Sequence, residues 1–436
     1  MLDRSGREIF PDNSLLNKLK ASPKTSGDKK PTIVVVGAGA AGFFAAITAA
    51  ESNPYASIIL VDSGRKVLRK VKISGGGRCN LTHHCFDPGH LSQNYPRGSR
   101  ELKSAFYEWN PKHTIEWFES HGVFTKVEED GRVFPTTDNS ETIIHCLRMR
   151  VSELGVKLLL ESKVKNITWK EMEQKWAVSI DRVSEMLTDK ICLALGSLAQ
   201  SGLVPVLQEL GHSIEHLVPS LFAFNLLPHP FNSLSGISLG EVSVRLLPKG
   251  KPRTGPLLIT HRGLSGPAIL KLSAWEAKTL AALDYKTEIE VNWLPQFSEN
   301  NLAEAFRDLR MTHGKKRVAL NFGLDLPKRL WIALLQKSGI NEEICWAQLS
   351  RDMEKELVAK LLRCRLAISG KTTNKDEFVT CGGIQRNQID FRTMESKRTK
   401  GLYFAGECID LDGITGGFNF QSAWTTGRLA GLAMAG

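Results

Sequence analysis

Residues 32–42, TIVVVGAGAAG, decide the fold of this 436-residue chain. The first five residues are all β-branched, which is typical of a buried strand, and a glycine-rich turn leads from them into an alanine-rich helix. Residues 57–62, SIILVD, are a second apolar run that ends in an acid. This order predicts a βαβ unit that opens a parallel sheet.

The glycine spacing in this turn predicts a dinucleotide site. Gly37, Gly39 and Gly42 form a GxGxxG pattern, and Asp62 lies 20 residues after the third glycine. Gly37 permits the tight turn, Gly39 lets the backbone approach a pyrophosphate, and Gly42 lets the helix pack against the strand. The helix N-terminus offers free N–H groups to the phosphates, and Asp62 can accept a hydrogen bond from a ribose hydroxyl. The alternative is a glycine-rich turn without a ligand.

The C-terminal segment favours FAD over NAD. Residues 401–431, GLYFAGECIDLDGITGGFNFQSAWTTGRLAG, predict a strand, a glycine–acid pair, a glycine-rich loop and a helix. Glu407 could bind a ribityl or ribose hydroxyl, and Thr415–Gly417 would place a second helix N-terminus beside the ligand. Such a terminus stabilises negative charge, as on a reduced flavin. Two chain ends that converge on one extended ligand suit FAD, whereas a simple packing helix is the alternative.

The middle of the chain has a different pattern. Short β-like segments punctuated by glycine and proline predict an antiparallel β domain over residues 206–299 and about 365–375, and residues 300–364 are mostly helical. The FAD-binding domain is expected to comprise residues 31–205 and 376–436. Residues 1–30 are polar and are expected to form a flexible tail.

Composition limits the partners. The net charge of +11 suits nucleic acid, an anionic membrane surface or a phosphate-bearing cofactor, but the basic residues are scattered, which favours a solvated basic surface. Eight cysteines without a CxxC pair suit a reducing compartment. The apolar run over residues 33–50 contains glycines that fit a turn better than a membrane helix, and no signal peptide is evident. We therefore expect a cytoplasmic protein with no membrane or DNA partner.

Residues 71–85, VKISGGGRCNLTHHC, allow three interpretations. Cys79 and Cys85 could form a redox dithiol, although their C-x5-C spacing differs from the usual C-x4-C. The two cysteines could also bind a metal with His83 and His84, but two-residue ligand spacing and a second cluster are missing. The glycines favour a third interpretation, a loop without side chains that lies against the cofactor. On this interpretation no metal site is predicted.

Several motifs in the same order resemble the YhiN/BaiN-type (HI0933-like) flavoproteins, a family of NAD(P)/FAD-dependent oxidoreductases. They are VVVGAGAAG, GRKVLRKVKISGGGRCNLT, GRVFPTTDNS, THRGLSGPAILKLS, VTCGGI, TMESK and GLYFAGECIDLDGITGGFNFQSAWTTG, and they extend from about residue 32 to the C-terminus. The resemblance implies an α/β fold: a two-segment, Rossmann-like FAD-binding domain with an inserted antiparallel β-barrel-like domain and a small helical domain.

The resemblance also implies the residues of the FAD site. The positions that match the family's motifs are Gly37, Gly39, Ala41, Gly42, Asp62, Arg65, Lys66, Ser74, Gly75, Gly76, Gly77, Arg78, Cys79, Asn80, Gly406, Glu407, Thr415, Gly416, Gly417, Phe418 and Asn419. Val164 resembles the strand residue that touches the adenine, and Gly196 ends a strand where the family has a more glycine-rich turn. Asp62 stands where glutamate is usual, and Cys381 stands where a small residue is usual.

The predicted function is FAD-dependent reduction of a small unsaturated or carbonyl-type substrate by hydride transfer through flavin N5. No second GxGxxG is visible, so NADH or NADPH is expected to dock transiently as reductant. The substrate is expected between the FAD and β domains. The catalytic residue is unassigned, with Cys79 and His261 as candidates by residue type, and Ser265 is a possible cap of the helix that begins near Pro267.

Two other functions remain open. The net charge also suits a flavin-dependent enzyme that modifies RNA, although no basic–aromatic RNA module is evident. A non-catalytic FAD-binding protein would carry the same motifs. The sequence does not predict the oligomeric state.

Overall fold

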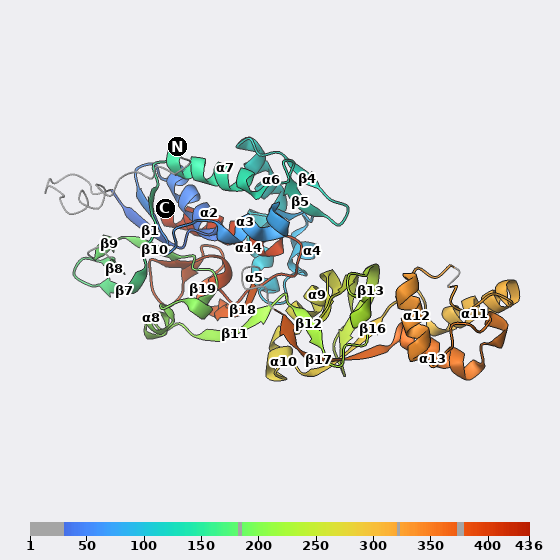
Figure 1. The fold of residues 1–436 in the computed structure, drawn as a ribbon. Helices are drawn as coiled ribbons and strands as arrows, with labels where there is room; N and C mark the ends of the chain where they lie inside the picture. Colours follow the sequence, from blue (N-terminus) through green and yellow to red (C-terminus); the bar gives the residue numbers. More distant parts are fainter. Residues whose placement is uncertain (1–29, 182–184, 321–322, 373–378) are drawn as a thin grey trace.

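The computed structural model describes residues 30–181, 185–320, 323–372 and 379–436. The predicted flexible tail lies outside the described residues, except for Lys30. The chain forms two parts: a sheet part, built around a seven-stranded sheet, and a barrel part, built around a closed barrel with helices at its far end (Figure 1).

The sheet part confirms the Rossmann-like prediction. At its centre β1 (Thr32–Val36) pairs in parallel with β2 (Ser57–Val61) and with β10 (Lys190–Leu193). The order is β19-β20-β21-β10-β1-β2-β6. The outer strands are β6 (Lys157–Leu159), β19 (Ile389–Asp390), β20 (Glu395–Ser396) and β21 (Leu402–Phe404). Because β21 pairs with β10, the C-terminal segment completes the sheet that the N-terminal segment begins.

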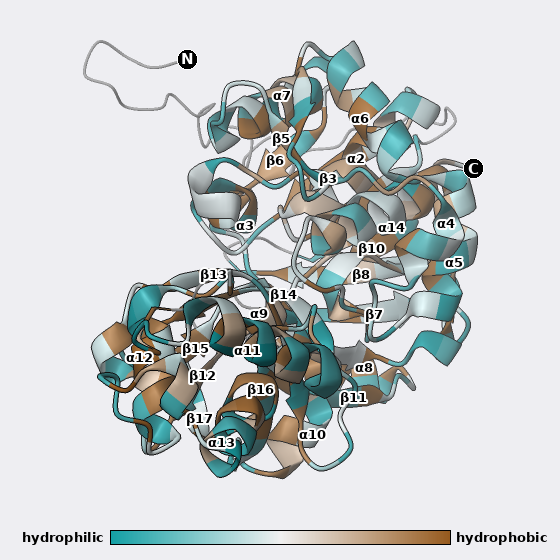
Figure 2. Cartoon of the chain, turned by 90° about the vertical axis from the view of Figure 1, so that its right-hand side faces the viewer, coloured by the Kyte–Doolittle hydropathy of each residue, from teal (hydrophilic) through white to brown (hydrophobic). Residues whose placement is uncertain are grey.

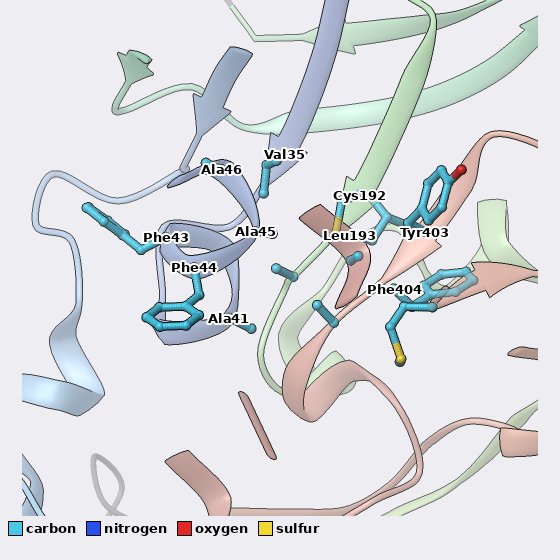
Figure 3. Close-up of a cluster of buried hydrophobic side chains, with 14 of the residues drawn as sticks. Val35, Ala41, Phe43, Phe44, Ala45, Ala46, Cys192, Leu193, Tyr403 and Phe404 are labelled. Carbon is cyan, nitrogen blue, oxygen red and sulfur yellow. The ribbon is translucent and has the colours of Figure 1, made fainter. Parts of the chain in front are cut away.

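Two helices from opposite ends of the chain pack against each other beside this sheet. They are α2 (Ala40–Ser52) and α14 (Phe418–Ala435). A Cβ at Gly427 would lie 2.5 Å from the carbonyl oxygen of Ala41, so the helices approach too closely for any side chain there. Phe44 lies on α2, and the packed core of β1, β10 and β21 lies beside that helix (Figure 3). The ring centroid of Phe44 is 5.2 Å from that of Trp424 on α14.

Smaller elements surround the sheet. The helices are α3 (Arg69–Ile73), α4 (Pro88–Ser92), α5 (Ser99–Glu108), α6 (Pro111–Ser120), α7 (Ser140–Glu153) and α8 (Val204–Glu209). One small sheet comprises β3 (Thr82–His83), β4 (Thr125–Val127) and β5 (Arg132–Pro135), and another comprises β7 (Val164–Lys170), β8 (Lys175–Ile180) and β9 (Met186–Thr188).

The barrel part confirms the predicted barrel-like β structure. Its strands close in the order β12-β15-β14-β13-β16-β17. Their bounds are β12 (Ala223–Leu226), β13 (Ser238–Leu246), β14 (Arg253–Ile259), β15 (Gly263–Ser265), β16 (Thr287–Asn292) and β17 (Cys364–Thr372). Its helices are α9 (Pro267–Trp275), α10 (Ala277–Ala282), α11 (Glu299–His313), α12 (Lys328–Lys337) and α13 (Arg351–Leu362). The last three lie at the end of the molecule away from the sheet part (Figure 1).

The two parts are joined by β11 (Ile214–Ser220) and β18 (Val379–Ile384), which pair antiparallel. A buried ion pair between Arg97 and Asp412 lies at the same junction. Arg97 also donates to the Ala274 carbonyl oxygen of α9, and Ser220 donates to Asp412 at 2.9 Å. These bonds fix α9 against the sheet part, and Figure 2 shows α9 and β14 at this junction. None of the described helices is long and apolar enough to cross a membrane.

Candidate active site

In the glycine-rich turn between β1 and α2, two glycines are required by close packing and the third borders open space. Gly37 has φ +109°, and a Cβ there would lie 2.2 Å from the carbonyl oxygen of Ala194. A Cβ at Gly42 would lie 1.8 Å from the Gly37 carbonyl oxygen. Gly39 differs, because a Cβ there would meet no protein atom within 4 Å. Gly39 is the N-cap of α2 without a side-chain cap, so the free N–H groups and the open space fit a pyrophosphate.

Asp62 follows β2 and already holds the glycine-rich turn. Its two carboxylate oxygens accept backbone N–H bonds from Ala38 at 2.6 Å and from Gly64 at 2.7 Å. A carboxylate oxygen has a second acceptor position, so a ribose hydroxyl can still donate to it. Asp62 therefore stabilises the glycine-rich turn through these two hydrogen bonds, a role that the sequence did not predict.

Among the other residues predicted around this end of FAD, Arg65, Lys66 and Val164 lie close to Asp62 in the chain or through the neighbouring strand. Arg65 and Lys66 are exposed directly after it. The Ser162 N–H donates to the Asp62 carbonyl oxygen at 2.9 Å, which places Val164 two residues away. Gly196 has φ +68° and open space at its Cβ position, and it follows β10, the neighbour of β1.

The SGGGRCN segment forms a tight loop. A 3-10 turn over Ser74–Gly77 contains Gly75 at φ +58° and Gly76 at φ +69°, and no atom lies within 4 Å of the Gly76 Cβ position. Arg78 returns to a right-handed conformation at φ −90°, Cys79 is again left-handed at φ +65°, and the Cys79 N–H donates to the Ser74 carbonyl oxygen at 3.0 Å. The segment is therefore a backbone bend in which Gly75 and Gly76 are exposed, and its contact with the cofactor stays a prediction.

The cysteines of this segment do not form a reactive pair in the structure. Both Cys79 and Cys85 are free thiols. Burial raises the pKa of the Cys79 thiol to about 12, and burial also raises the pKa of Cys85. A thiol that stays protonated at neutral pH is a poor nucleophile and a poor redox partner. In the described part of the chain, no three His, Cys, Asp or Glu side chains are placed to hold a metal ion.

Arg78 and Asn80 hold the loop from both sides. Arg78 pairs with Glu128 at 2.6 Å, and its guanidinium carbon lies 4.0 Å above the ring of Phe134. The amide of Asn80, oriented to suit its neighbours, accepts from the Gly417 N–H at 2.9 Å and donates to the Thr82 carbonyl oxygen at 3.0 Å. The loop is thereby fixed to the start of α14.

The start of α14 is free of side-chain caps. Its N-cap is Gly417, at φ +91°, and a Cβ there would lie 2.4 Å from the Thr82 carbonyl oxygen. The side chain of Asn419 accepts from and donates to the backbone of Gly413, at 2.9 Å in each bond. The Thr415–Gly417 turn between these anchors is partly exposed. The uncapped N–H groups fit the negative charge of a reduced flavin.

Glu407 has partners that the sequence did not reveal. One carboxylate oxygen forms an ion pair with Lys70, and the other accepts from the Thr380 N–H at 2.9 Å. Gly406 before it has φ +74°, and a Cβ there would lie 2.9 Å from the Cβ of Ala41. The predicted contact of Glu407 with a ribityl or ribose hydroxyl must use its remaining acceptor positions.

His83 lies in the same region, and in the sequence it stands out only as a possible metal ligand. Its ring stacks on Phe418 with centroids 4.7 Å apart, and its Nε2 lies 3.1 Å from the Asp130 carbonyl oxygen. A carbonyl only accepts, so Nε2 carries the proton and the buried Nδ1 is an acceptor with no partner among the described residues. Burial lowers the pKa of His83 and favours the neutral ring. Its position three residues after the SGGGRCN motif is the sequence feature that could have marked it as a site residue.

The barrel residues predicted by residue type are less well placed. His261 is exposed in the turn between β14 and β15. The predicted cap at Ser265 is wrong, because Ser265 belongs to β15 and Gly266 is the N-cap of α9. Gly266 has φ +94°, and a Cβ there would lie 2.9 Å from the Pro256 carbonyl oxygen, so close packing selects glycine. Pro267 does begin the helix.

The open glycine turn after β1, the acid after β2 and the second uncapped helix from the far end of the chain define a two-segment, Rossmann-like FAD-binding protein. A family model confirms this class: the HI0933-like protein Rossmann domain matches residues 31–433, and the chain belongs to that family. Family and fold together make it a FAD-dependent oxidoreductase.

Curated relatives match almost the whole chain. A 3-dehydro-bile acid Δ(4,6)-reductase of Clostridium scindens is 28% identical over 415 residues, which cover 92% of this chain and 98% of that protein. Ribosomal RNA dihydrouridine synthases of Escherichia coli and Haemophilus influenzae are 29% and 30% identical. Those matches cover 90% and 92% of this chain and 95% and 98% of the two synthases.

A solved structure shares the fold. The 3-ketosteroid-Δ4-(5α)-dehydrogenase of Rhodococcus jostii RHA1 matches with a TM-score of 0.50 and 13% identity, over 94% of this chain and 98% of that one.

Proposed function

We propose that the protein reduces a carbon–carbon double bond conjugated to a carbonyl, with NADH or NADPH as the electron source. The observation that carries this proposal is the reacting unit common to the two kinds of relative. A 3-dehydro-Δ(4,6) bile acid is a ketone conjugated to ring double bonds, and dihydrouridine is uridine whose ring double bond, conjugated to a carbonyl, has been saturated. When bound, FAD supplies the hydride from N5 of its reduced form.

The arrangement of this chain's own residues supports that chemistry. The turn at Gly39 would hold the pyrophosphate, and Gly76 would let the loop lie against the cofactor. The uncapped start of α14 at Gly417 would stabilise its negative charge. The stacked rings of His83 and Phe418 would form one wall beside it. A substrate would then enter between this wall and α9, where the two parts of the molecule meet.

Within this class we favour a uracil in ribosomal RNA as the substrate. Two relatives over 90% or more of this chain carry that activity in their names, and the net charge of +11 suits a polyanion. A small, steroid-like enone is the second candidate, supported by the relative of 28% identity that matches over the same length. This second candidate corresponds to the small unsaturated substrate predicted from the sequence.

An anaerobic experiment tests the proposal. The holoprotein is titrated with NADH and, separately, NADPH while flavin absorbance is followed, and the reduced protein is then mixed with cyclohex-2-enone, a 3-keto-4-ene steroid or an unmodified ribosomal RNA transcript. We expect one nucleotide to bleach the flavin and one acceptor class to restore its colour, with the product gaining two hydrogen atoms by mass spectrometry. Reoxidation by oxygen alone, with every acceptor inert, would refute the proposal.

A further inference from the structure

Two half-buried cations at the junction form no ion pair with any described residue. Arg253 begins β14, and Lys271 lies on α9, the strand and helix that Figure 2 shows at the boundary with the sheet part. The guanidinium carbon of Arg253 lies 4.1 Å over the ring of Trp275, and its Nε is buried without a hydrogen-bond partner among the described residues. Lys271 donates to the Thr254 carbonyl oxygen at 3.1 Å. Within the described ranges, neither cation has a carboxylate oxygen within 4 Å.

This arrangement is electrostatically costly. Burial lowers the pKa of Lys271, the charges of Asp130 and Glu241 act against this, and the positive charge of Arg253 adds to the lowering. Burial also lowers the pKa of Arg253, with Glu276 acting against it at longer range. Two like charges that are partly removed from water repel each other and lose solvation, and an anion placed between them would relieve both costs.

The pair lies beside the predicted flavin end of the site. Trp275, on which Arg253 stacks, packs against the core of the sheet part. Lys271 interacts electrostatically with Asp130, whose carbonyl oxygen accepts from His83, and His83 stacks on Phe418 at the start of α14. The cations therefore face the wall that the proposed substrate would contact.

We propose that Arg253 and Lys271 form an oxyanion-binding subsite that holds a phosphate or carboxylate group of the substrate next to the flavin. The subsite rests on the proposed function, because it assigns the anionic part of that substrate. An RNA phosphate and the carboxylate of a small acid offer the same chemistry to a guanidinium and an ammonium. The guanidinium N–H groups of Arg253 can donate hydrogen bonds to either oxyanion.

Calorimetric titration of the FAD-loaded protein at low salt tests this subsite, with inorganic phosphate and acetate as probes. The variants are Arg253→Gln and Lys271→Gln, and the matched control is Lys251→Gln, an exposed lysine two residues before β14. We expect the dissociation constant of the favoured anion to rise at least tenfold in each variant and to stay within twofold of wild type in the control. Tighter phosphate binding would indicate an RNA source, and tighter acetate binding a carboxylic acid.

Three results would overturn the subsite: no saturable anion binding by the wild-type protein, equal binding by the variants, or loss of FAD from the variants, which would assign the pair to the cofactor. Reduction of all three acceptors of the functional test is measured on the same wild-type sample. Failure with every acceptor bears on the proposed function alone, whereas failure of anion binding beside normal reduction of one acceptor refutes only the subsite.

Discussion

Replacement of Gly39 by alanine separates cofactor binding from folding. The backbone at Gly39 has φ −92° and ψ −171°, a conformation open to any residue, and a Cβ there meets no protein atom within 4 Å. The protein without FAD should therefore tolerate the methyl group. Alanine at an unstrained glycine position commonly adds about 0.4–1 kcal/mol of stability, because the unfolded chain has less freedom.

The FAD-loaded protein should respond in the opposite way. The new methyl group would occupy the space in which the pyrophosphate approaches the N–H groups of α2. A hydrogen bond to a charged group is worth about 1.5–3 kcal/mol, so loss of one such bond should cost about that much binding free energy. Because 1.4 kcal/mol corresponds to tenfold, the affinity for FAD should fall about 10- to 140-fold.

The assay measures two quantities on each variant: the melting temperature of the FAD-free protein and the dissociation constant of FAD by fluorescence quenching. Gly240→Ala is the matched control, since its Cβ position is also open but lies on β13 of the barrel. Gly37→Ala is the opposite case, because its Cβ would lie 2.2 Å from a carbonyl oxygen, and it should not fold. Normal FAD affinity in Gly39→Ala would refute the placement of the pyrophosphate.

Three further predictions concern other parts of the molecule. Cys85→Ser should keep the rate of flavin reduction within twofold of wild type, measured by stopped flow, whereas a tenfold loss would restore the dithiol hypothesis. His212 has a pKa lowered by burial, so the unfolded chain takes up a proton near pH 6.5 while the folded chain does not. The free energy of unfolding should therefore fall as the pH drops below 6.5, by at most about 1.4 kcal/mol per pH unit from this group. Urea titrations at pH 7.5 and 5.5 measure this loss, and His212→Gln should remove the part that His212 contributes. The same difference between the two pH values in the variant and in wild type would contradict this prediction. Asp412→Asn leaves Arg97 buried without its partner and should cost about 3–5 kcal/mol of unfolding free energy in urea, and a loss below about 1 kcal/mol would show that the junction does not depend on this pair.

The strand, turn and helix at residues 32–52 were predictable because local sequence chemistry determines them. β-branched residues favour the strand, and Gly37 and Gly42 avoid clashes with the backbone of β10's end and of the turn itself. The same holds for the strand and helix at residues 402–435. The pairing of β21 with β10 agrees with the prediction that one FAD-binding domain is built from both chain ends.

The partners of the charged side chains were not predictable, because they depend on contacts between distant segments. Lys70 meets Glu407 across more than 300 residues of sequence, and no local pattern marks that ion pair. The predicted cap of α9 at Ser265 is wrong for a similar reason. Serine is the better N-cap by propensity, but the close approach of Gly266 to the Pro256 carbonyl excludes any side chain.

The division of the molecule into two parts suggests where its specificity is determined. The glycine turn at residues 37–42, the loop at residues 74–80 and the start of α14 all come from the sheet part, and the bond between Asn80 and Gly417 joins the loop to that helix. A change in any of them would disturb the cofactor before it altered substrate choice. The barrel part meets the sheet part at α9, whose Ala274 carbonyl oxygen accepts from Arg97. On the proposed function, the sheet part would supply the hydride chemistry and the barrel part would recognise the substrate, with Arg253 and Lys271 on the recognising side.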